Sequence, residues 1–317
     1  MQQEPKVNIF ILHFGSPVET FNCLESSLNL NYSNFNIVLI DNDPSQILKT
    51  EFSKKYDVEY LNQDFVSLKQ KKVFIVNTGE NLGFSGGFNF GIDKMKKYGR
   101  SDFAWLLNND LVCEKNSLVN LIQFSKENKN HSIIGSCIEI DKENRTFYGA
   151  NLNLITGDDK PVMLSNNNTK NCLELNQQKR WLFAINGAAI FINLNLNTDR
   201  NILPTKYFLF FEEFYLAEKN KQKSLKIITC LSSTVYHQSS VNTSKNSKFL
   251  IYYIFRNRLA FFLEFYPQYF ILIFLYQSIR VGGGYFKQFK FKEFVWVLQA
   301  IIDAPLTRFS IKPFFGK

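Results

Sequence analysis

Residues 77–110 combine a segment rich in glycine and asparagine with an acidic strand end. Five glycines fall between Gly79 and Gly91, and Asn108-Asn109-Asp110 follows an apolar run. Closely spaced glycines let backbone approach a ligand, and the N-terminus of a following helix favours anions. A carboxylate at a strand end can hold a divalent cation, and hard oxygen ligands suit Mg2+ or Mn2+. The two halves together indicate a site for a nucleotide diphosphate and its metal, although each half alone also fits a plain turn.

The spacing of these glycines differs from that of two common phosphate-binding motifs. Gly83-Phe84-Ser85-Gly86-Gly87 is not the G-x-G-x-x-G of dinucleotide-binding proteins, and no Gly-Lys-Ser or Gly-Lys-Thr follows it as in a P-loop. The segment therefore predicts a phosphate site of another kind.

Two further groups have side chains suited to chemistry. Glu212 and Glu213 follow the aromatic run Tyr207–Phe211, at what we expect to be a strand end. One of two adjacent carboxylates beside apolar residues can act as a general base with a raised pKa, whereas a solvated acidic helix start is the simpler alternative. His237 closes the run 234–237. Imidazole beside a carboxylate and phosphates suits Mn2+, and a purely structural histidine is its alternative.

Alternating strands and helices must position these groups. Short apolar runs that stop at polar or glycine residues predict strands, and helical spacing between them predicts helices. The alternation predicts an α/β fold with a mostly parallel, doubly wound sheet, in which ligands bind beyond the carboxyl ends of the strands. Asp41, the glycine segment and Asp110 all fall there. The predicted strands are 7–14, 37–40, 73–76, 103–107 and one within 227–237; the predicted helices are 18–30, 88–98 and 216–226.

The remainder of the chain is less regular. Residues 141–180 are polar and rich in asparagine, which predicts loops and an antiparallel excursion, and Ala184–Asn193 is an apolar run. From about residue 245 the chain is expected to be helical and amphipathic, with breaks at Pro267 and at Gly282-Gly283-Gly284.

Positive charge is concentrated at the C-terminus. Residues 245–317 hold 11 of the 37 Lys and Arg residues and 3 of the 28 Asp and Glu residues, so this segment carries +8 of the net +9. A basic, aromatic-rich tail on a near-neutral body indicates peripheral membrane contact, or else a homodimer interface. We expect no nucleic-acid partner, because the tail has long apolar runs and no nucleic-acid-binding motif. We divide the chain into 1–244 and 245–317.

Other features bear on the compartment. The longest uncharged apolar segment, 265–279, has 15 residues and is shorter than the roughly 18–20 that span a bilayer. The five cysteines are scattered with no C-x-x-C pair, which favours a reducing compartment over a disulfide framework or a zinc site. The N-terminus lacks the apolar core of a signal peptide. We expect a cytoplasmic protein, peripheral on the inner face of the cell membrane.

In this order the motifs resemble glycosyltransferase family 2, the inverting class with the GT-A nucleotide-sugar fold. They most resemble its rhamnosyltransferase-like branch, which includes galactofuranosyl transferases. The resemblance covers residues 5–260 and is carried by Asp41-Asn42, the loop 81–89, Asn108-Asn109-Asp110, 187–192, Glu212-Glu213, His237 and Arg256-Asn257.

Three departures from the family pattern stand out. The Asn usual after the first strand is absent, since the chain reads Phe14-Gly15. The Glu-Asp pair is Glu212-Glu213, and Phe214-Tyr215 lacks the aspartate often found two residues after that pair.

The resemblance implies a GT-A (Rossmann-like) mixed sheet flanked by helices, with a C-terminal amphipathic helical extension. It also implies metal-dependent, inverting transfer of a rhamnose-like deoxyhexose, a galactofuranose or another hexose. The donor would be a nucleotide diphosphate sugar, and the acceptor a glycan or lipid-linked hydroxyl in surface polysaccharide synthesis. Asp110 and His237 would hold Mn2+ or Mg2+, and Glu213, or else Glu212, would be the base. The implied donor-binding residues are Asp41, Asn42, Asn81, Gly83, Phe84, Gly86, Gly87, Asn89, Asn108, Asn109 and Arg256.

Two other functions are weighed. A nucleotidyltransferase on the same fold needs a basic glycine-rich loop near the N-terminus, and Gly15-Ser16-Pro17 has no Lys or Arg nearby. A non-catalytic, membrane-associated glycan-binding or scaffold protein is disfavoured by the presence of Asp110, Glu213 and His237 together.

Overall fold

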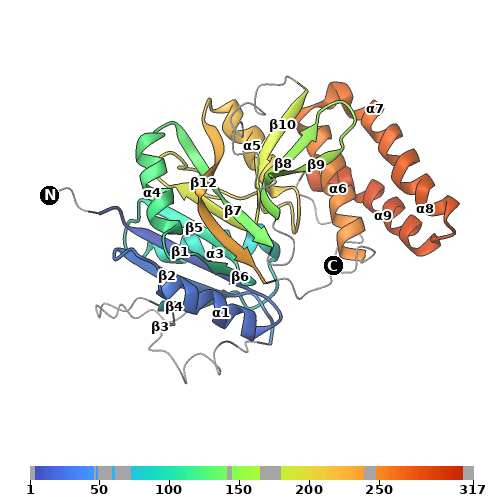
Figure 1. The fold of residues 1–317 in the computed structure, drawn as a ribbon. Coiled ribbons are helices and arrows are strands. Elements are labelled where there is room, and N and C mark those ends of the chain that lie inside the picture. The colour runs from blue at the N-terminus through green and yellow to red at the C-terminus, as the bar shows by residue number, and fades with distance from the viewer. Residues whose placement is uncertain are drawn as a thin grey trace.

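Apolar runs form the parallel half of a mixed sheet (Figure 1). The computed structural model describes residues 4–45, 48, 59–60, 73–140, 145–164, 180–238 and 248–309. In it β1 (Val7–His13) pairs in parallel with β2 (Phe35–Asp41) and β5 (Phe103–Asn108). β2 pairs with β4 (Val73–Asn77), which pairs with β3 (Glu59–Tyr60). Every residue of β1 is buried, as expected for a central strand covered on both faces, and the four strands predicted in this half are confirmed.

The second half of the sheet is mostly antiparallel. β11 (Ala189–Asn193) pairs antiparallel with β5 and with β7 (His131–Ile140), so it joins the two halves. The expected antiparallel excursion is confirmed, since β8 pairs antiparallel with β7, β9 and β10. The remaining strands are β6 (Leu111–Cys113), β8 (Arg145–Asn153), β9 (Asp159–Leu164), β10 (Trp181–Ile185) and β12 (Lys226–His237). Residues 141–144 and 165–179 of the predicted loops lie outside the described residues.

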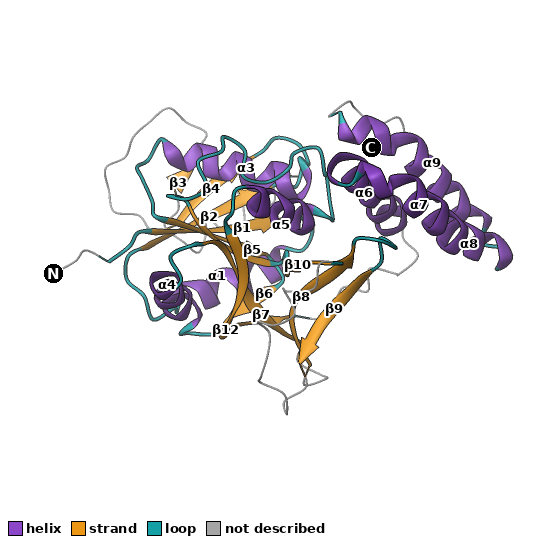
Figure 2. Cartoon of the chain, turned by 90° about the horizontal axis from the view of Figure 1, so that it is seen from above, coloured by secondary structure: helices purple, strands orange, loops and turns teal. Residues whose placement is uncertain are grey.

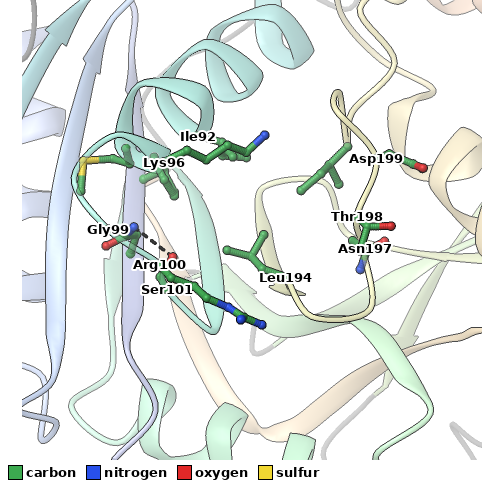
Figure 3. Close-up of a pocket in the computed structure, with 13 residues that line it drawn as sticks. Ile92, Lys96, Gly99, Arg100, Ser101, Leu194, Asn197, Thr198 and Asp199 are labelled. Atoms are coloured by element: carbon green, nitrogen blue, oxygen red, sulfur yellow. Dashed lines mark hydrogen bonds between the residues drawn. The ribbon is translucent and has the colours of Figure 1, made fainter.

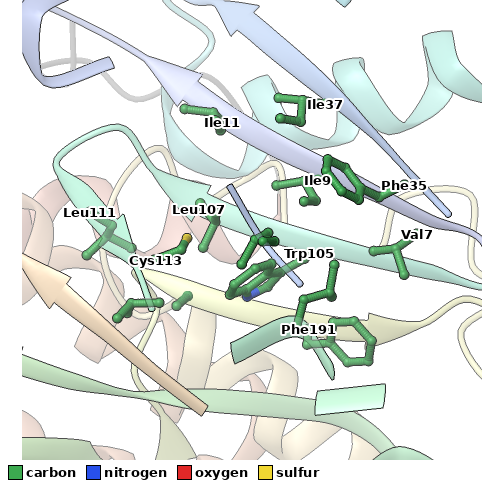
Figure 4. Packing of buried hydrophobic residues seen from close by; sticks show 14 of the residues in the cluster. Val7, Ile9, Ile11, Phe35, Ile37, Trp105, Leu107, Leu111, Cys113 and Phe191 are labelled. Carbon is green, nitrogen blue, oxygen red and sulfur yellow. The ribbon is translucent and has the colours of Figure 1, made fainter. Parts of the chain in front are cut away.

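Helices cover both faces of the parallel half (Figure 2). α1 (Pro17–Leu28) and α4 (Ser117–Glu127) pack against the face that carries Ile9 and Trp105, and Figure 4 shows part of this cluster. α3 (Gly83–Lys96) and α5 (Glu212–Gln222) pack against the face that carries Phe10 and Leu106. Residues of one strand alternate between the two clusters because side chains alternate across a sheet.

The C-terminal helices pack partly into the same core. α6 (Lys248–Phe265) places Ala260, Phe261 and Phe262 in a cluster with residues of β10 and α5. It also packs against α9 (Phe291–Arg308) through a second cluster. The other elements are α7 (Pro267–Gln277), the π-helical turn η2 (Ser278–Gly282) and α8 (Gly283–Lys287). Within the described ranges, none of the helices combines the length and apolarity that crossing a bilayer requires.

One of the two predicted breaks in this tail is confirmed. α6 ends just before Pro267, as predicted. The break at Gly282-Gly283-Gly284 is wrong: Gly282 and Gly283 have helical φ of −64° and −62°, and η2 carries the helix through them. The chain turns instead at Phe289, whose φ is +58°.

Candidate active site

A single asparagine side chain ties the end of β2 to the glycine segment. Asn42 Nδ2 donates to Asn81 Oδ1 (3.0 Å) and to Gly83 O (3.3 Å). Asn42 Oδ1 accepts from Leu82 N (3.0 Å) and from Thr78 Oγ1 (3.2 Å). Asn42 is buried, and these four bonds use both its N–H groups and both its lone pairs. Asn42 and Asn81 therefore shape the predicted donor loop through bonds within the protein.

The glycine segment forms the first half of α3, so the helix predicted at 88–98 begins five residues earlier, at Gly83. A Cβ on Gly87 would lie 2.5 Å from Leu12 Cδ1, and one on Gly91 would lie 2.5 Å from Ile40 Cδ1. Glycine weakens a helix, but here it lets α3 lie directly on β1 and β2, and this packing outweighs propensity. The close fit places the N-terminus of α3 near the carboxyl ends of these strands.

Gly83 begins α3 in a conformation that other residues resist. Its φ is +72°, and a Cβ would lie 2.3 Å from Phe208 O, which accepts a 2.8 Å hydrogen bond from Phe84 N. We expect Gly83→Ala to lower the free energy of unfolding by at least about 2 kcal/mol, measured by urea denaturation. The control is Gly79→Ala, with φ of +79° and nothing within 4 Å of its Cβ. It should cost only about 1 kcal/mol of backbone strain, and equal losses would contradict the steric argument.

The two predicted metal ligands lie side by side just beyond β5. β6 pairs antiparallel with the end of β12, which sets His237 opposite Leu111. Asp110 Oδ2 is then 3.2 Å from His237 Nε2, and this hydrogen bond raises the pKa of His237. Asp110 Oδ1 is buried and has no hydrogen-bond partner among the described residues. In the same part of the chain, no group of three or more His, Cys, Asp and Glu residues is arranged to hold a metal. The structure therefore brings together the two predicted ligands, Asp110 and His237.

Hydrogen bonds between polar side chains connect this strand end to α1 and β1. Asn109 Nδ2 donates to Thr20 Oγ1 (3.0 Å), and Thr20 Oγ1 lies 2.7 Å from His13 Nδ1. Burial lowers the pKa of His13 to about 4, so its ring is neutral at neutral pH. Sequence reasoning missed Thr20 and His13. The signal available in the sequence was a histidine near the end of the predicted strand 7–14. The structure shows that this histidine is in register with Asp41 at the end of β2.

The two glutamates start α5 beside the turn between β10 and β11. A Cβ on Gly187 in that turn would lie 3.5 Å from Glu212 Oε1 and 3.8 Å from Glu213 Oε2. The neighbouring Ala188 O accepts from Asn108 N (2.9 Å), so this turn is bonded to the end of β5. The fold thus brings the acidic pair close to the strand end that leads to Asp110.

The acidic pair begins a helix, so its expected place at a strand end is wrong. Residues 207–211 form a turn, with φ of +66° at Phe210 and +73° at Phe211. Hydrogen bonds donated by α6 and by α3 to carbonyl groups of this turn stabilise it. The alternative of a solvated helix start does not hold for Glu212, which is 5% exposed. Burial raises the pKa of Glu212 well above its usual range and the pKa of Glu213 to about 7.

The aromatic turn 207–211 is held by α6. Asn257 Nδ2 donates to Leu209 O (2.7 Å) and to Phe210 O (2.8 Å), and Asn257 Oδ1 accepts from Arg256 Nε (2.9 Å) and Nη2 (2.7 Å). Both side chains are buried, and the Arg256 guanidinium lies 4.7 Å from the centroid of the Tyr253 ring. The Arg256-Asn257 motif thus fixes the strained turn that leads into the two glutamates.

Removing the Asn257 amide should destabilise the protein strongly. Asn257→Ala leaves two carbonyl groups and a buried guanidinium without their partner, so we expect a loss of about 2–4 kcal/mol in urea denaturation. Asn195→Ala is the matched control, because Asn195 also accepts from an arginine, Arg100, but at an exposed position. Its loss should stay within about 0.5 kcal/mol. A similar small loss for Asn257→Ala would show that the turn does not need this clamp.

Two predicted donor-binding side chains are engaged inside the protein. Asn89 Nδ2 donates to Leu203 O (2.8 Å), and Asn89 Oδ1 accepts from Leu203 N (3.1 Å). Arg256 is bonded to Asn257, as described above. Asp41 is also buried, and among the described residues its carboxylate accepts hydrogen bonds from Asn77 Nδ2 (3.2 Å) and Asp43 N (3.4 Å). Burial raises the pKa of Asp41 to about 6.

A pocket of about 300 Å³ lies at the amino ends of the parallel strands, opposite the ends that carry Asp41 and Asp110. Figure 3 shows its lining. It is formed near the amino ends of β1 and β5 by residues such as Asn8 and Ser101, with Lys96 and Arg100 from the end of α3 and the loop after it. None of the predicted site residues lines it. It is therefore separate from the group of side chains around Asp110.

Several solved structures share the fold of this chain over nearly its whole length. GalNAc-T7 with UDP, GalNAc and Mn2+ is 14% identical, with a TM-score of 0.60 over 97% of this chain. Residues 1–349 of TarS from S. aureus are 13% identical (TM-score 0.51, 94% of this chain and 80% of that one). The mannosyltransferase PcManGT from Pyrobaculum calidifontis, with GDP-Man and Mn2+, is 8% identical (0.54, 96% and 76%). At such identities the likeness shows the fold alone, and the chain spans 58% of the length of the GalNAc-T7 chain.

Sequence comparison places the chain more specifically. No curated protein matches it. The model of the family "Glycosyl transferase family 2" matches residues 14–191, which is more than half of the chain and includes the Asp41, glycine and Asp110 segments. With its mixed sheet flanked by helices, as in the GT-A glycosyltransferases, the chain belongs to glycosyl transferase family 2.

Proposed function

We propose that this protein is a metal-dependent, inverting glycosyltransferase. It would move a sugar from a nucleotide diphosphate donor to a hydroxyl of a glycan or lipid-linked acceptor. The observation that carries the proposal is the approach of Glu212 and Glu213 to Gly187, beside the strand end that leads to Asp110 and His237. A base and a cation site close together match the two tasks of the reaction, activation of the acceptor and neutralisation of the leaving diphosphate.

The cation site suits a metal that arrives with the donor. Asp110 and His237 would hold Mn2+ or Mg2+, which commonly bind through one or two protein ligands plus substrate phosphates. Asp110 Oδ1, buried without a partner among the described residues, fits such a ligand. When bound, the cation supplies Lewis-acid stabilisation to the departing diphosphate. GalNAc-T7 and PcManGT were both solved with Mn2+.

We assign the base to Glu213. Glu212 is buried, its Oε2 has no partner among the described residues, and burial raises its pKa well above the usual range, which favours the protonated acid. Glu213 is half-buried and titrates near neutrality, so it can take the proton of the acceptor hydroxyl. The hydroxyl oxygen attacks the anomeric carbon from the face opposite the diphosphate. The bond from that carbon to the diphosphate breaks in the same step, which inverts the anomeric configuration.

We assign the donor to the edge formed by Asp41 and the N-terminus of α3. Asp41 would meet the nucleobase or ribose, and Gly83, Phe84, Gly86 and Gly87 would line the donor. In this proposal Asn42, Asn81, Asn89 and Arg256 position that edge from behind, because their side chains are already bonded within the protein. Donors of the rhamnosyltransferase-like branch, acceptors in surface polysaccharide synthesis, and a cytoplasmic setting remain part of the proposal.

A screen of nucleotide sugars tests the proposal. A panel of deoxyhexose, galactofuranose and hexose donors is added to the protein with and without Mn2+ while thermal unfolding is followed. A cognate donor at 100 times its Kd should add about 2.7 kcal/mol to stability. The selected donor is then used in a transfer assay that reports the anomer formed. Failure of every donor to stabilise the protein, or product with retained configuration, would refute the proposal.

The pH dependence of transfer gives a separate test. Because burial raises the pKa of Glu213 to about 7, the base is increasingly protonated below that pH. We expect kcat to rise with pH through about 7 and then to level off, whereas an ordinary exposed glutamate would give a plateau from about pH 5.5. The profile should be measured at saturating donor and Mn2+. A rate that is flat from pH 5.5 to 8 would contradict the assignment.

A further inference from the structure

The C-terminal helices present an exposed apolar surface that the transfer reaction does not use. Within the described residues, 14 of the 18 exposed large apolar side chains lie between Phe249 and Phe309. On α7 and η2 they recur at helical spacing, with Ile271 and Ile279 each more than 70% exposed. On α9 they form a stripe of Phe291, Val295, Leu298 and Ile302. The opposite face of α9 packs on α6, so this stripe is additional to the core contact.

The turn between α8 and α9 carries the most exposed apolar side chain of this surface. Phe289 is 79% exposed, and its φ of +58° turns the chain sharply at the end of α8. Its ring centroid is 6.2 Å from that of Phe291, which is 5.9 Å from that of Phe286. We call α6 to α9 the helical arm, and Figures 1 and 2 both show α8 at the end of this arm that is farthest from the sheet. We call residues 286–292 the aromatic tip.

Basic residues alternate with these rings. The tip reads Phe286-Lys287-Gln288-Phe289-Lys290-Phe291-Lys292, so three lysines and no carboxylate share seven positions with three phenylalanines. Aromatic side chains that insert at the level of lipid headgroups, with lysine ammonium groups beside them, suit an interface with anionic lipid. A symmetric interface that joins the aromatic tips of two copies would instead place like charges near one another, which is unfavourable.

We propose that the aromatic tip and the exposed stripes of α7 and α9 dock on the surface of a bilayer that contains anionic phospholipid. The chain would lie on the membrane without crossing it, since no described helix has the character of a membrane span. The docking surface is separate from the side chains around Asp110. It holds whether or not the proposed transfer reaction is correct.

Vesicle flotation with the full chain tests this inference. Vesicles of phosphatidylcholine alone are compared with vesicles in which about one lipid in three is phosphatidylglycerol. The apolar variant is Phe286→Ser, Phe289→Ser and Phe291→Ser together, and the charge variant is Lys287→Gln, Lys290→Gln and Lys292→Gln. The control carries Met163→Ser and Leu231→Ser, which remove exposed apolar side chains elsewhere. Circular dichroism and thermal unfolding verify that each variant folds.

We expect the unmodified protein and the control to float with the anionic vesicles only. The apolar variant should lose binding, and the charge variant should bind on the order of a hundredfold more weakly. Phe289→Trp should show a blue shift of its emission when anionic vesicles are added. The inference is overturned if the folded apolar variant floats like the unmodified protein. It is also overturned if neither vesicle type binds. Light scattering that then shows a dimer, which the apolar variant converts to a monomer, would mean that the surface joins two copies.

Discussion

Glu213→Gln is expected to lower kcat by about 10²- to 10⁴-fold. The amide keeps the size of the side chain but cannot take the acceptor proton, so the loss should fall on the chemical step. Donor affinity should change little, because the proposed donor residues lie at the ends of β2 and β5 and at the start of α3. The measurement is the initial rate of transfer at saturating donor, together with calorimetric binding of the nucleoside diphosphate in the presence of Mn2+.

The adjacent glutamate supplies a demanding control for this expectation. Glu212 is buried, and burial raises its pKa well above the usual range and so favours its neutral form, which Glu212→Gln imitates. Its effect on kcat should stay within about tenfold, the cost of a modest rearrangement. If Glu212→Gln instead abolishes transfer while Glu213→Gln does not, Glu212 is the base. Full activity of both variants would remove this pair from the mechanism.

Asp110→Asn is expected to reduce kcat/KM on the order of 10³-fold, which corresponds to several kcal/mol of stabilisation of the leaving group. The carboxylate lies 3.2 Å from His237 and has one oxygen without a partner among the described residues, so the charge removed is the one offered to the cation. A binding measurement separates this role from a structural one. Nucleoside diphosphate should bind the unmodified protein more tightly with Mn2+ than without it, and Asp110→Asn should lose that difference.

Two companion variants make this expectation specific. His237→Gln should weaken the Mn2+ effect less than Asp110→Asn, because it removes a neutral ligand and leaves the carboxylate in place. Asn22→Ala is the control, since Asn22 Nδ2 donates to Gln238 Oε1, next to His237, and is not one of the proposed ligands. It should keep the Mn2+ effect. If Asp110→Asn also keeps it, the cation is held elsewhere.

The parallel half of the fold could be predicted from sequence because its strands are buried on both faces. β1, β2, β4 and β5 are therefore short, nearly continuous apolar runs, and the polar residues that end them coincide with Asp41 and with Asn108-Asn109-Asp110. The strand β7 was missed. It starts at His131 and mixes serine and glycine with isoleucine, so it lacks such a run. Its place depends on its neighbours β11, β8 and β12.

The parts of the site that sequence did not reveal depend on contacts between distant residues. α3 begins at Gly83 because Phe84 N finds an acceptor in Phe208 O, more than 120 positions away. The left-handed turn at Phe210 and Phe211 is stabilised by Asn257 from another helix. No local pattern contains that information. The Arg256-Asn257 motif was recognisable, but its role in positioning the turn emerged only from the hydrogen bonds.

The turn 207–211 has a mechanical consequence. Phe208 O is bonded to the start of α3, Leu209 O and Phe210 O are bonded to α6, and the next residues are Glu212 and Glu213. A displacement of α6 would therefore be transmitted through these bonds both to the proposed donor site and to the proposed base. Since α6 also packs against α9, a load applied to the helical arm would alter the alignment of donor and base together. The helical arm and the proposed active site are thus connected through the hydrogen bonds of this turn.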